Sequence, residues 1–498
     1  MVDFVGGIAM SLGVPMVMQG GVLASGVALS GLLPEAPACL LLLGEDTQQL
    51  FADLVAMGYS VTALPTCQSL DLAQFPTATR QGICQVDLPL PQADTGSFAA
   101  AIVLALTPQV HPLALFDELS KWLSDDAIVV VAGDLGAADV PRMAHWLDYV
   151  VAIAGRCGFV ETRGEPVPVD RSTRAFARIF RRGPAPRWQV RHVRPRDFDG
   201  IATLFLEVFG HPLSRALWDW KYAHGHGNAV VAARHGVLIA HYGGMYRDVM
   251  LGGAPEWVFQ ICDVMVHPKE RGVMTRQGPF LLTAATSGEI YGPLGFGFPN
   301  VRAMQVAERM GLYTEVGQMV SVRWEPSAPG FRWGTRVSVV ERHSAVGRAQ
   351  INVLWEAMAH DLREGVVGMR HWEYVEQRYF SHPHNHYEVL VVTSRLTGKP
   401  LGAMVLRRDG ESCEMLDAIG PLVNLHLLID QARRLTGLWG LKQVYCWITK
   451  NYAQRFVDCG GTEGVLNISI PTSSWTNDPR AEIFKDRWWL MSGDTDFR

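Results

Sequence analysis

The N-terminal third of the chain alternates continuous apolar runs with stretches of helical periodicity. The apolar runs have the length of buried strands and read "ACLLLLG" (38–44), "YSVTALP" (59–65), "AAIVLAL" (100–106) and "AIVVVAG" (127–133). Amphipathic segments lie between them, such as "DTQQLFADLVAMG" (46–58) and "HPLALFDELSKWL" (111–123). Strands that alternate with helices predict an α/β fold with a parallel, doubly wound sheet. We expect "CGFVETRG" (157–164) and "RAFARIFRR" (174–182) to close it as an antiparallel pair.

Two further blocks follow this one. Pro- and Gly-rich joints at 183–188 and 325–330 predict domains at 1–185, 186–328 and 329–498. The second block opens with "VRPRDFDGIATLFLEVFG" (193–210), which predicts a strand and then a helix capped by Asp197.

The second and third blocks share a pattern, which predicts a duplicated domain. "LWDWKYAHGHGNAVVAARHGVLIAHYGG" (217–244) and "YVEQRYFSHPHNHYEVLVVTSRLTGKPLGAMV" (374–405) both run from an aromatic residue through Lys/Arg-Tyr and a His-bearing turn to two strands. The spacing of these histidines is loose and no cysteine accompanies them, so we expect turn and capping roles and no metal.

Composition narrows the class of protein. The chain has 498 residues, a net charge of −5 and 48% hydrophobic residues, as expected of a globular protein with about three domains that does not bind nucleic acid. The short arginine-rich run at 181–196 is interpreted as a solvated linker. Eight cysteines without a CxxC pair favour a reducing, cytoplasmic location without structural zinc.

The N-terminus is unusually apolar. No charged residue occurs from Phe4 to Pro34, and the first basic residue is Arg80. Glycines interrupt the segment and no basic flank anchors it, so we expect residues 1–36 to form buried or interface helices. A membrane segment is the alternative.

The first block resembles the class I S-adenosylmethionine methyltransferases, with residues 96–133 similar to that family's fourth strand, helix and fifth strand. The resemblance implies a Rossmann-like domain. Gly44-Glu45-Asp46-Thr47 has one glycine where the family has a glycine-rich cofactor loop. The second strand ends in Ala63-Leu64-Pro65, where the family has an acidic residue that binds the ribose, and proline offers neither a carboxylate nor an N–H. We therefore expect a scaffold or dimerisation domain that has lost its cofactor, with a homodimer as one expected state.

The rest of the chain resembles a tandem pair of GCN5-related N-acetyltransferase (GNAT) units. The similar stretches are "VRPRDF" (193–198), "DVMVHPKERGVMTR" (263–276), "GFGFPNVRAMQVAERMGL" (295–312) and "RWWLMSGDTDF" (487–497). The resemblance implies two GNAT α/β units after the Rossmann-like domain, with acetyl-CoA or another acyl-CoA as co-substrate.

The family holds acyl-CoA between two splayed strands and on a loop that opens a helix, where backbone N–H groups face the pyrophosphate. The family pattern Arg/Gln-x-x-Gly-x-Gly/Ala is matched here by Lys269-Glu270-Arg271-Gly272-Val273-Met274, in which Gly272 agrees and Met274 replaces a small residue. The resemblance implies these coenzyme-binding residues: Val264, Val266, Lys269, Arg271, Gly272, Val273, Met274, Thr275 and Asn300. A purely structural turn is the alternative.

Asp263 is the candidate catalytic residue. Its position resembles that of the family carboxylate that takes a proton from the acceptor amine. A salt bridge or strand-end cap is the alternative role. The family's acid is often a tyrosine, but Ala307 occupies that position, which leaves Tyr313 or His267 as candidates.

The second unit lacks such a loop after "EMLDAIG" (414–420), so we expect one acyl-CoA site per chain. The second unit would pack against the first and form part of the acceptor pocket. The leading hypothesis is an N-acyltransferase that acts on a small amine, and the resemblance to this branch implies an amino sugar as one candidate. The alternatives are a non-catalytic binding or assembly protein and a functional methyltransferase with accessory GNAT units.

Overall fold

The computed structural model describes residue 29 and residues 32–44, 48–64, 96, 98–104, 112–134, 150–162, 167–168, 175–184, 186–271, 278–291, 294–473 and 480–498. It divides into two compact units. The first contains residues 1–200 and 230–241, and the second contains residues 201–229 and 242–498.

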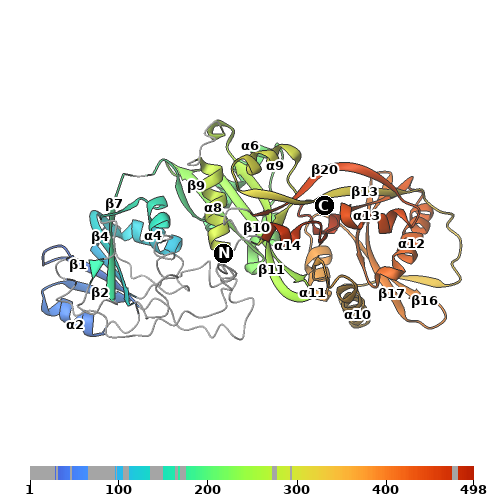
Figure 1. Cartoon of the computed structure of the whole chain (residues 1–498), viewed down its shortest axis with the longest axis horizontal. Helices are drawn as coiled ribbons and strands as arrows, with labels where there is room; N and C mark the ends of the chain where they lie inside the picture. Colours follow the sequence, from blue (N-terminus) through green and yellow to red (C-terminus); the bar gives the residue numbers. More distant parts are fainter. Residues whose placement is uncertain are drawn as a thin grey trace, which may run out of the picture. The chain divides into compact units, whose positions relative to one another are not determined.

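The first unit contains a seven-stranded sheet whose main path is β2-β1-β3-β4-β7-β5 (Figure 1). The strands are β1 Cys39–Leu43, β2 Ser60–Leu64, β3 Phe98–Leu104, β4 Leu123–Asp134, β5 Phe159–Glu161, β6 Val167–Pro168 and β7 Ala175–Arg182, with helices α2 Gln48–Ala56 and α4 Pro112–Trp122. The pairs β1–β2, β1–β3 and β3–β4 are parallel, whereas β7 is antiparallel to β4 and β5. The predicted strands and their antiparallel closure are therefore confirmed.

Both faces of this sheet are covered around β1. Successive side chains of a strand point to opposite faces, yet Leu40 to Leu43 are all fully buried. This explains why the strand is a continuous apolar run and does not alternate.

A second sheet has the main path β12-β11-β10-β15-β21, with β9 pairing with β10 and β8. Its strands are β8 Gln189–His192, β9 Gly227–Arg234, β10 Val237–Leu251, β11 Ala254–Val266, β12 Gly295–Gly297, β15 Val366–Gly368 and β21 Trp488–Trp489. The helices of this region are α6 Phe198–Phe209, α7 Arg215–Tyr222, α8 Pro279–Tyr291 and α9 Val301–Arg309. Helix α8 connects the parallel strands β11 and β12.

The third sheet has the order β14-β16-β17-β18-β19-β13-β20. Its strands are β14 Thr335–Val339, β16 Glu388–Ser394, β17 Pro400–Asp409, β18 Ser412–Ile419, β19 Gln443–Thr449, β13 Tyr313–Trp324 and β20 Thr462–Ser473. The helices are α10 Ala345–Asp361, α11 Trp372–Val375, α12 Leu425–Leu438, α13 Lys450–Val457 and α14 Arg480–Phe484. Helix α12 connects the parallel strands β18 and β19, as α8 connects β11 and β12.

Strand β13 precedes the joint at 325–330 in sequence but lies in the third sheet. It pairs antiparallel with both β19 and β20, and Figure 1 shows β13 and β20 running together. Strands β15 and β21, which follow the joint, lie in the second sheet, where β15 pairs with β10. The segments on the two sides of the joint therefore contribute strands to each other's sheets.

Several predictions concern residues outside the described part of the chain. Residues 1–28, 30–31, 45–47 and 65 are among them, so the apolar N-terminus and the degenerate cofactor motifs stay predictions. Among the described residues, no helix is both long and apolar enough to cross a membrane.

Candidate active site

Strands β11 and β12 separate before β11 ends. Their pairing runs from Phe259–Gly295 to Ile261–Gly297, but β11 continues to Val266. Beyond Ile261 this edge of β11 therefore has no partner from β12. Val264 and Val266, which the sequence assigned to the coenzyme, lie on this stretch.

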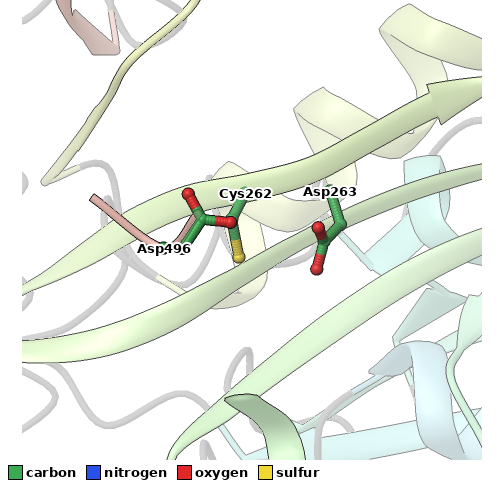
Figure 2. Close-up of side chains that lie close together, drawn as sticks. All are labelled: Cys262, Asp263 and Asp496. Atoms are coloured by element: carbon green, nitrogen blue, oxygen red, sulfur yellow. The ribbon is translucent and has the colours of Figure 1, made fainter. Parts of the chain in front are cut away.

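The backbone of β11 is irregular at Asp263, whose φ is +49°. In a regular strand Cys262 and Asp263 would point to opposite faces. Here the thiol of Cys262 and the carboxylates of Asp263 and Asp496 lie within 4.8 Å of one another. Figure 2 shows the Cys262 sulfur between the two carboxylates. A left-handed conformation is strained for a residue other than glycine and often marks a functional site.

Lys221 lies in the last turn of α7 and reaches both carboxylates. Helix α7 begins after Ser214, whose hydroxyl accepts from the Leu217 N–H at 3.1 Å. Lys221 Nζ donates to Asp263 at 2.9 and 3.1 Å and to Asp496 at 2.7 Å. The lysine is 3% exposed. Burial opposes its charge, but the two carboxylates outweigh burial and raise the pKa of Lys221 above its ordinary value.

Tyr222 is the second side chain that holds Asp263. Its hydroxyl donates to Asp263 Oδ2 at 2.8 Å and lies 3.5 Å from Cys262 Sγ. Burial, together with the negative charge of Asp263, raises the pKa of Tyr222 well above its ordinary range. The phenol therefore stays protonated and serves as a donor. Burial and the same charge raise the pKa of Cys262, so its sulfur is a thiol.

Asp496 belongs to a C-terminal segment that buried polar groups hold in place. The backbone carbonyl of Asp494 accepts from Gln260 Nε2 at 2.6 Å, and its carboxylate accepts from Arg370 at 2.6 Å. Arg378 donates to the carbonyls of three further residues, Gly493, Thr495 and Arg498. The segment thus brings a carboxylate from the far end of the sequence to Lys221.

The predicted repeat places a similar contact in the third sheet. Lys221-Tyr222 aligns with Arg378-Tyr379, and Tyr379 donates to Asp417 at 3.0 Å as Tyr222 does to Asp263. Asp417 lies on β18, which, like β11, precedes a parallel crossover. Burial raises the pKa of Asp417, although Arg370 donates to it at 3.0 Å. Asp417 is fully buried, whereas the Asp263 side chain is 7% exposed.

In the described part of the predicted pyrophosphate loop, Lys269 and Arg271 are exposed and Glu270 is buried. Lys269 lies in the short 3-10 helix Pro268–Glu270, and Arg271 donates through Nε to the Val266 carbonyl at 2.9 Å. Gly272, Val273, Met274 and Thr275 lie outside the described residues, so their role stays a prediction. Asn300 caps α9, where its side chain accepts from the Ala303 N–H at 2.9 Å.

The two candidates for a proton donor differ in their surroundings. Tyr313 is buried and hydrogen-bonds to Tyr242, and burial raises the pKa of Tyr313 above its ordinary value. His267 lies 3.0 Å from Glu207 through Nε2, and its Nδ1 accepts from the Lys269 N–H at 3.2 Å.

The donor set of Cys262, Asp263 and Asp496 is of a kind that binds metal ions. Lys221 Nζ, however, lies within 3 Å of both carboxylates, at the place where a bridging cation would bind. The ammonium therefore supplies the positive charge that the two carboxylates need, and we assign no metal to the site.

Sequence reasoning identified Asp263 but missed Lys221, Tyr222 and Asp496 as its neighbours. The Lys/Arg-Tyr pair was visible as part of the repeat, and "SGDTDF" was visible as a motif. Nothing in either pattern indicated that these segments meet. The anticipated alternative for Asp263, a salt bridge, is present in the structure.

Comparison with known proteins assigns part of the chain. Residues 189–298 match the family described as "Acetyltransferase (GNAT) domain". No curated protein matches the chain.

Solved structures that are similar to the chain include three bacterial proteins. A protein of unknown function from Enterococcus faecalis V583, titled a probable N-acyltransferase, is 11% identical, with a TM-score of 0.47 over 60% of this chain and 74% of its own. A GCN5-related N-acetyltransferase from Kribbella flavida is 12% identical, with a TM-score of 0.42 over 57% of this chain and 70% of its own. One from Anabaena variabilis ATCC 29413 is 10% identical, with a TM-score of 0.45 over 57% of this chain and 72% of its own. Likeness at this level gives no information on substrate or residue roles.

Proposed function

We propose that the chain is an acyl-CoA-dependent N-acyltransferase that transfers an acyl group, in the simplest case acetyl, to the amine of a small molecule. The observation that carries the proposal is the match of residues 189–298 to the GNAT acetyltransferase domain. The matched residues include β11, α8 and β12, and thus the separating strands.

The coenzyme would bind along the edge of β11 beyond Ile261, where β12 does not pair with it. Backbone groups of Val264 would bond to the pantetheine arm, and Val266 would offer its N–H, because its carbonyl already accepts from Arg271. The pyrophosphate would lie on the loop at 269–275, where Lys269 and Arg271 add positive charge. We propose that Asn300 also lies beside the coenzyme, because it is exposed at the start of α9.

Asp263 would accept the proton that the acceptor ammonium loses before attack. Lys221 and Tyr222 hold the carboxylate through three hydrogen bonds, so its orientation toward the separating strands is fixed. The free amine then attacks the thioester carbon, and the carbon–sulfur bond breaks. The coenzyme leaves as a thiolate, which takes up the proton that the attacking nitrogen loses as the amide forms. The pKa of a free thiol is about 8.5, so departure requires little help from an acid.

Lys221 and Tyr222 are positioning residues in this proposal. They fix the carboxylate in a single orientation and keep it charged inside a buried site. A negative charge at this depth without a partner would cost several kcal/mol. Asp496 accepts a further hydrogen bond from the Lys221 ammonium and adds a second negative charge beside it.

We propose a small primary amine as the acceptor, with an amino sugar as one candidate, and we place part of its pocket on the C-terminal GNAT-like segment. The N-terminal domain, which resembles a methyltransferase, would serve as a scaffold.

A non-catalytic binding protein is the second candidate function. The ion pair favours this candidate, because Asp263 lies 2.9 Å from Lys221 and this contact can serve to stabilise the fold alone. The two candidates differ in one respect: only the enzyme turns over acetyl-CoA.

The test joins binding and turnover. The protein is titrated with acetyl-CoA by calorimetry and then assayed for thiol release with a panel of small amines, beside Gly272→Glu. Gly155→Glu is the matched control, because Gly155 is exposed and a side chain there meets nothing within 4 Å. Micromolar binding that only Gly272→Glu abolishes, followed by amine-dependent thiol release, supports the enzyme. Binding of acetyl-CoA without thiol release for any amine favours the binding protein. Absence of acetyl-CoA binding would show that the loop at 269–275 holds no coenzyme, either in an enzyme or in a binding protein.

A further inference from the structure

A pocket that the acyl-transfer proposal does not use lies in the third sheet, between β14 and the last turns of α12. Its volume is about 290 Å³, close to the lower end for small-molecule sites. Four arginines line it, together with the backbone and side chains of the joint that precedes β14: Arg332, Arg336, Arg395 and Arg434 beside Pro329, Gly330 and Phe331. No acidic residue lines the pocket among the residues that the structure describes.

Three of the arginines, Arg395, Arg434 and Arg332, are held in place by hydrogen bonds that their Nε atoms donate. Arg395 donates from Nε to the carbonyls of Arg332 and Thr335, both at 2.8 Å. Arg434 donates from Nε to Gln431 at 2.8 Å, and the buried Gln431 in turn donates to Thr335 at 2.6 Å. In the described part of the chain, the terminal Nη groups of Arg395 and Arg434 have no hydrogen-bond acceptor.

Arg332 is held by Asp430, at 2.8 Å from Nε and 3.2 Å from Nη2. Its Nη2 also donates to the Ser327 hydroxyl at 3.1 Å. Arg336 is exposed, and its guanidinium has no ion-pair partner among the described residues. Among the described residues, a single carboxylate, that of Asp430, forms an ion pair with these four arginines.

An arrangement of this kind is unfavourable while the pocket holds only water. Guanidinium groups stay protonated at all ordinary pH values, so they repel one another. The hydrogen bonds through Nε hold them together nonetheless and leave pairs of parallel N–H donors, the geometry that suits phosphate oxygens. A single carboxylate ligand would neutralise only part of the excess charge, whereas a phosphate or diphosphate matches it.

An aromatic surface adjoins the donors. Phe331 is 58% exposed, and the Arg395 guanidinium lies 4.0 Å from the centre of its ring. Trp333 is 88% exposed and packs edge-on against Phe331, with 5.2 Å between ring centres. Exposed aromatic rings beside an anion site offer a surface for the organic part of a ligand.

We propose that this pocket binds the phosphate or diphosphate group of a small phosphorylated molecule whose organic part lies against Phe331. Arg434, Arg395 and Arg336 bind the phosphate oxygens, and Asp430 with Gln431 sets the orientation of the guanidiniums. The site is independent of the acyl-transfer proposal and uses none of its residues.

The first experiment is calorimetric titration of the full chain with inorganic pyrophosphate at constant ionic strength. Arg434→Gln and Arg336→Gln each remove a donor, and each is expected to raise Kd at least about tenfold, the effect of one charge-assisted hydrogen bond. The matched control is Arg433→Gln, on the same helix, which changes the net charge equally but does not line the pocket. Its Kd is expected to stay within about twofold of wild type.

Absence of pyrophosphate binding overturns the proposal. So do equal effects of all three variants, which would indicate general attraction, and no effect of any, which would place the anion elsewhere. Unfolding midpoints of the variants confirm that each remains folded.

The second experiment compares phenyl phosphate with inorganic phosphate. Tighter binding of phenyl phosphate that Phe331→Ala removes supports the aromatic contact. Equal affinity of the two probes for the wild-type protein overturns that part of the assignment.

Discussion

At the scale of single residues, Asp263 combines two properties that a purely structural carboxylate does not need. Its φ of +49° interrupts a long strand, and its side chain meets donors from α7 and lies close to a second carboxylate. A salt bridge alone could form without backbone strain. The strain is explained if the carboxylate must face the point where β11 and β12 separate.

Replacement of Asp263 by Asn tests this role. The change keeps the shape of the side chain but removes the base, so the turnover number of acyl transfer should fall at least about 100-fold. The acetyl-CoA Kd should stay within about twofold, because backbone groups of β11 hold the coenzyme. The measurements are steady-state thiol release and calorimetry.

Asp219→Asn is the control for that experiment. Asp219 lies on the same helix as Lys221 and forms an exposed pair with Arg215, so the same change of charge should leave turnover unaltered. Full activity of Asp263→Asn would remove Asp263 from the mechanism.

His382 gives a prediction on pH. Burial, and then the positive charge of Arg378, lowers the pKa of His382 to about 3. Its Nδ1 accepts from the N–H groups of His384 and Asn385 at 3.2 and 3.0 Å, which only the neutral ring can do. The unfolded chain takes up the proton near pH 6.5, whereas the folded chain takes it up near pH 3. Stability from this residue is therefore complete above pH 6.5 and is lost as the pH falls toward 3.

His382→Asn should reduce this acid sensitivity, because an amide oxygen can accept the same bonds without binding a proton. The free energy of unfolding in urea at pH 7 and pH 5 gives the comparison. The wild type should lose more stability than the variant between these two values. An equal loss in both proteins would mean that other groups cause the acid response.

At the scale of elements, the sequence identified strands better than it identified their neighbours. The run "ACLLLLG" predicted a strand buried on both faces, because nothing polar interrupts it, and β1 is such a strand. The segment 313–324 forms the strand β13, but a pattern of apolar positions does not say which sheet will receive a strand. The placement of β13 between β19 and β20 depends on residues more than a hundred positions away, and the local sequence does not encode that partnership.

The central position of β13 can be tested with a proline. Ser321 is 1% exposed and pairs with Trp447 on β19 and Gly464 on β20. In a strand with neighbours on both sides, proline removes a ladder hydrogen bond, so Ser321→Pro should lower the free energy of unfolding by about 3 kcal/mol or more. Urea denaturation measures the difference.

Ser321→Ala separates the backbone effect from the side chain. The Ser321 hydroxyl makes one long hydrogen bond, at 3.3 Å to the Gly464 carbonyl, so alanine should cost at most about 1 kcal/mol. Equal losses for proline and alanine would show that the ladder on this strand contributes little.

At the scale of the whole molecule, the candidate site shows where prediction from sequence reaches its limit. Asp263 was found because its neighbours along the chain carry a recognisable pattern. Lys221 and Asp496 were not found as its partners, because they lie 42 and 233 positions away by residue number and meet it only in the folded chain. A lone Lys or Asp has no local signature of burial, and these two are buried only because each compensates the charge of the other.

The C-terminal segment should therefore be required for folding of the second unit. Deletion of residues 494–498 removes acceptors from three buried cations, Lys221, Arg370 and Arg378. Loss of one partner of a buried ion pair costs about 3–5 kcal/mol, and the total stability of a domain is about 5–15 kcal/mol. The truncated chain should show no cooperative unfolding of this unit in urea, followed by circular dichroism.

Phe497→Ala is the control in the same segment: the ring is 54% exposed, and its loss should cost at most about 1 kcal/mol. A truncated chain that unfolds at the wild-type midpoint would show that the buried cations find other partners, and the assignment of Asp496 to the site would fall with it.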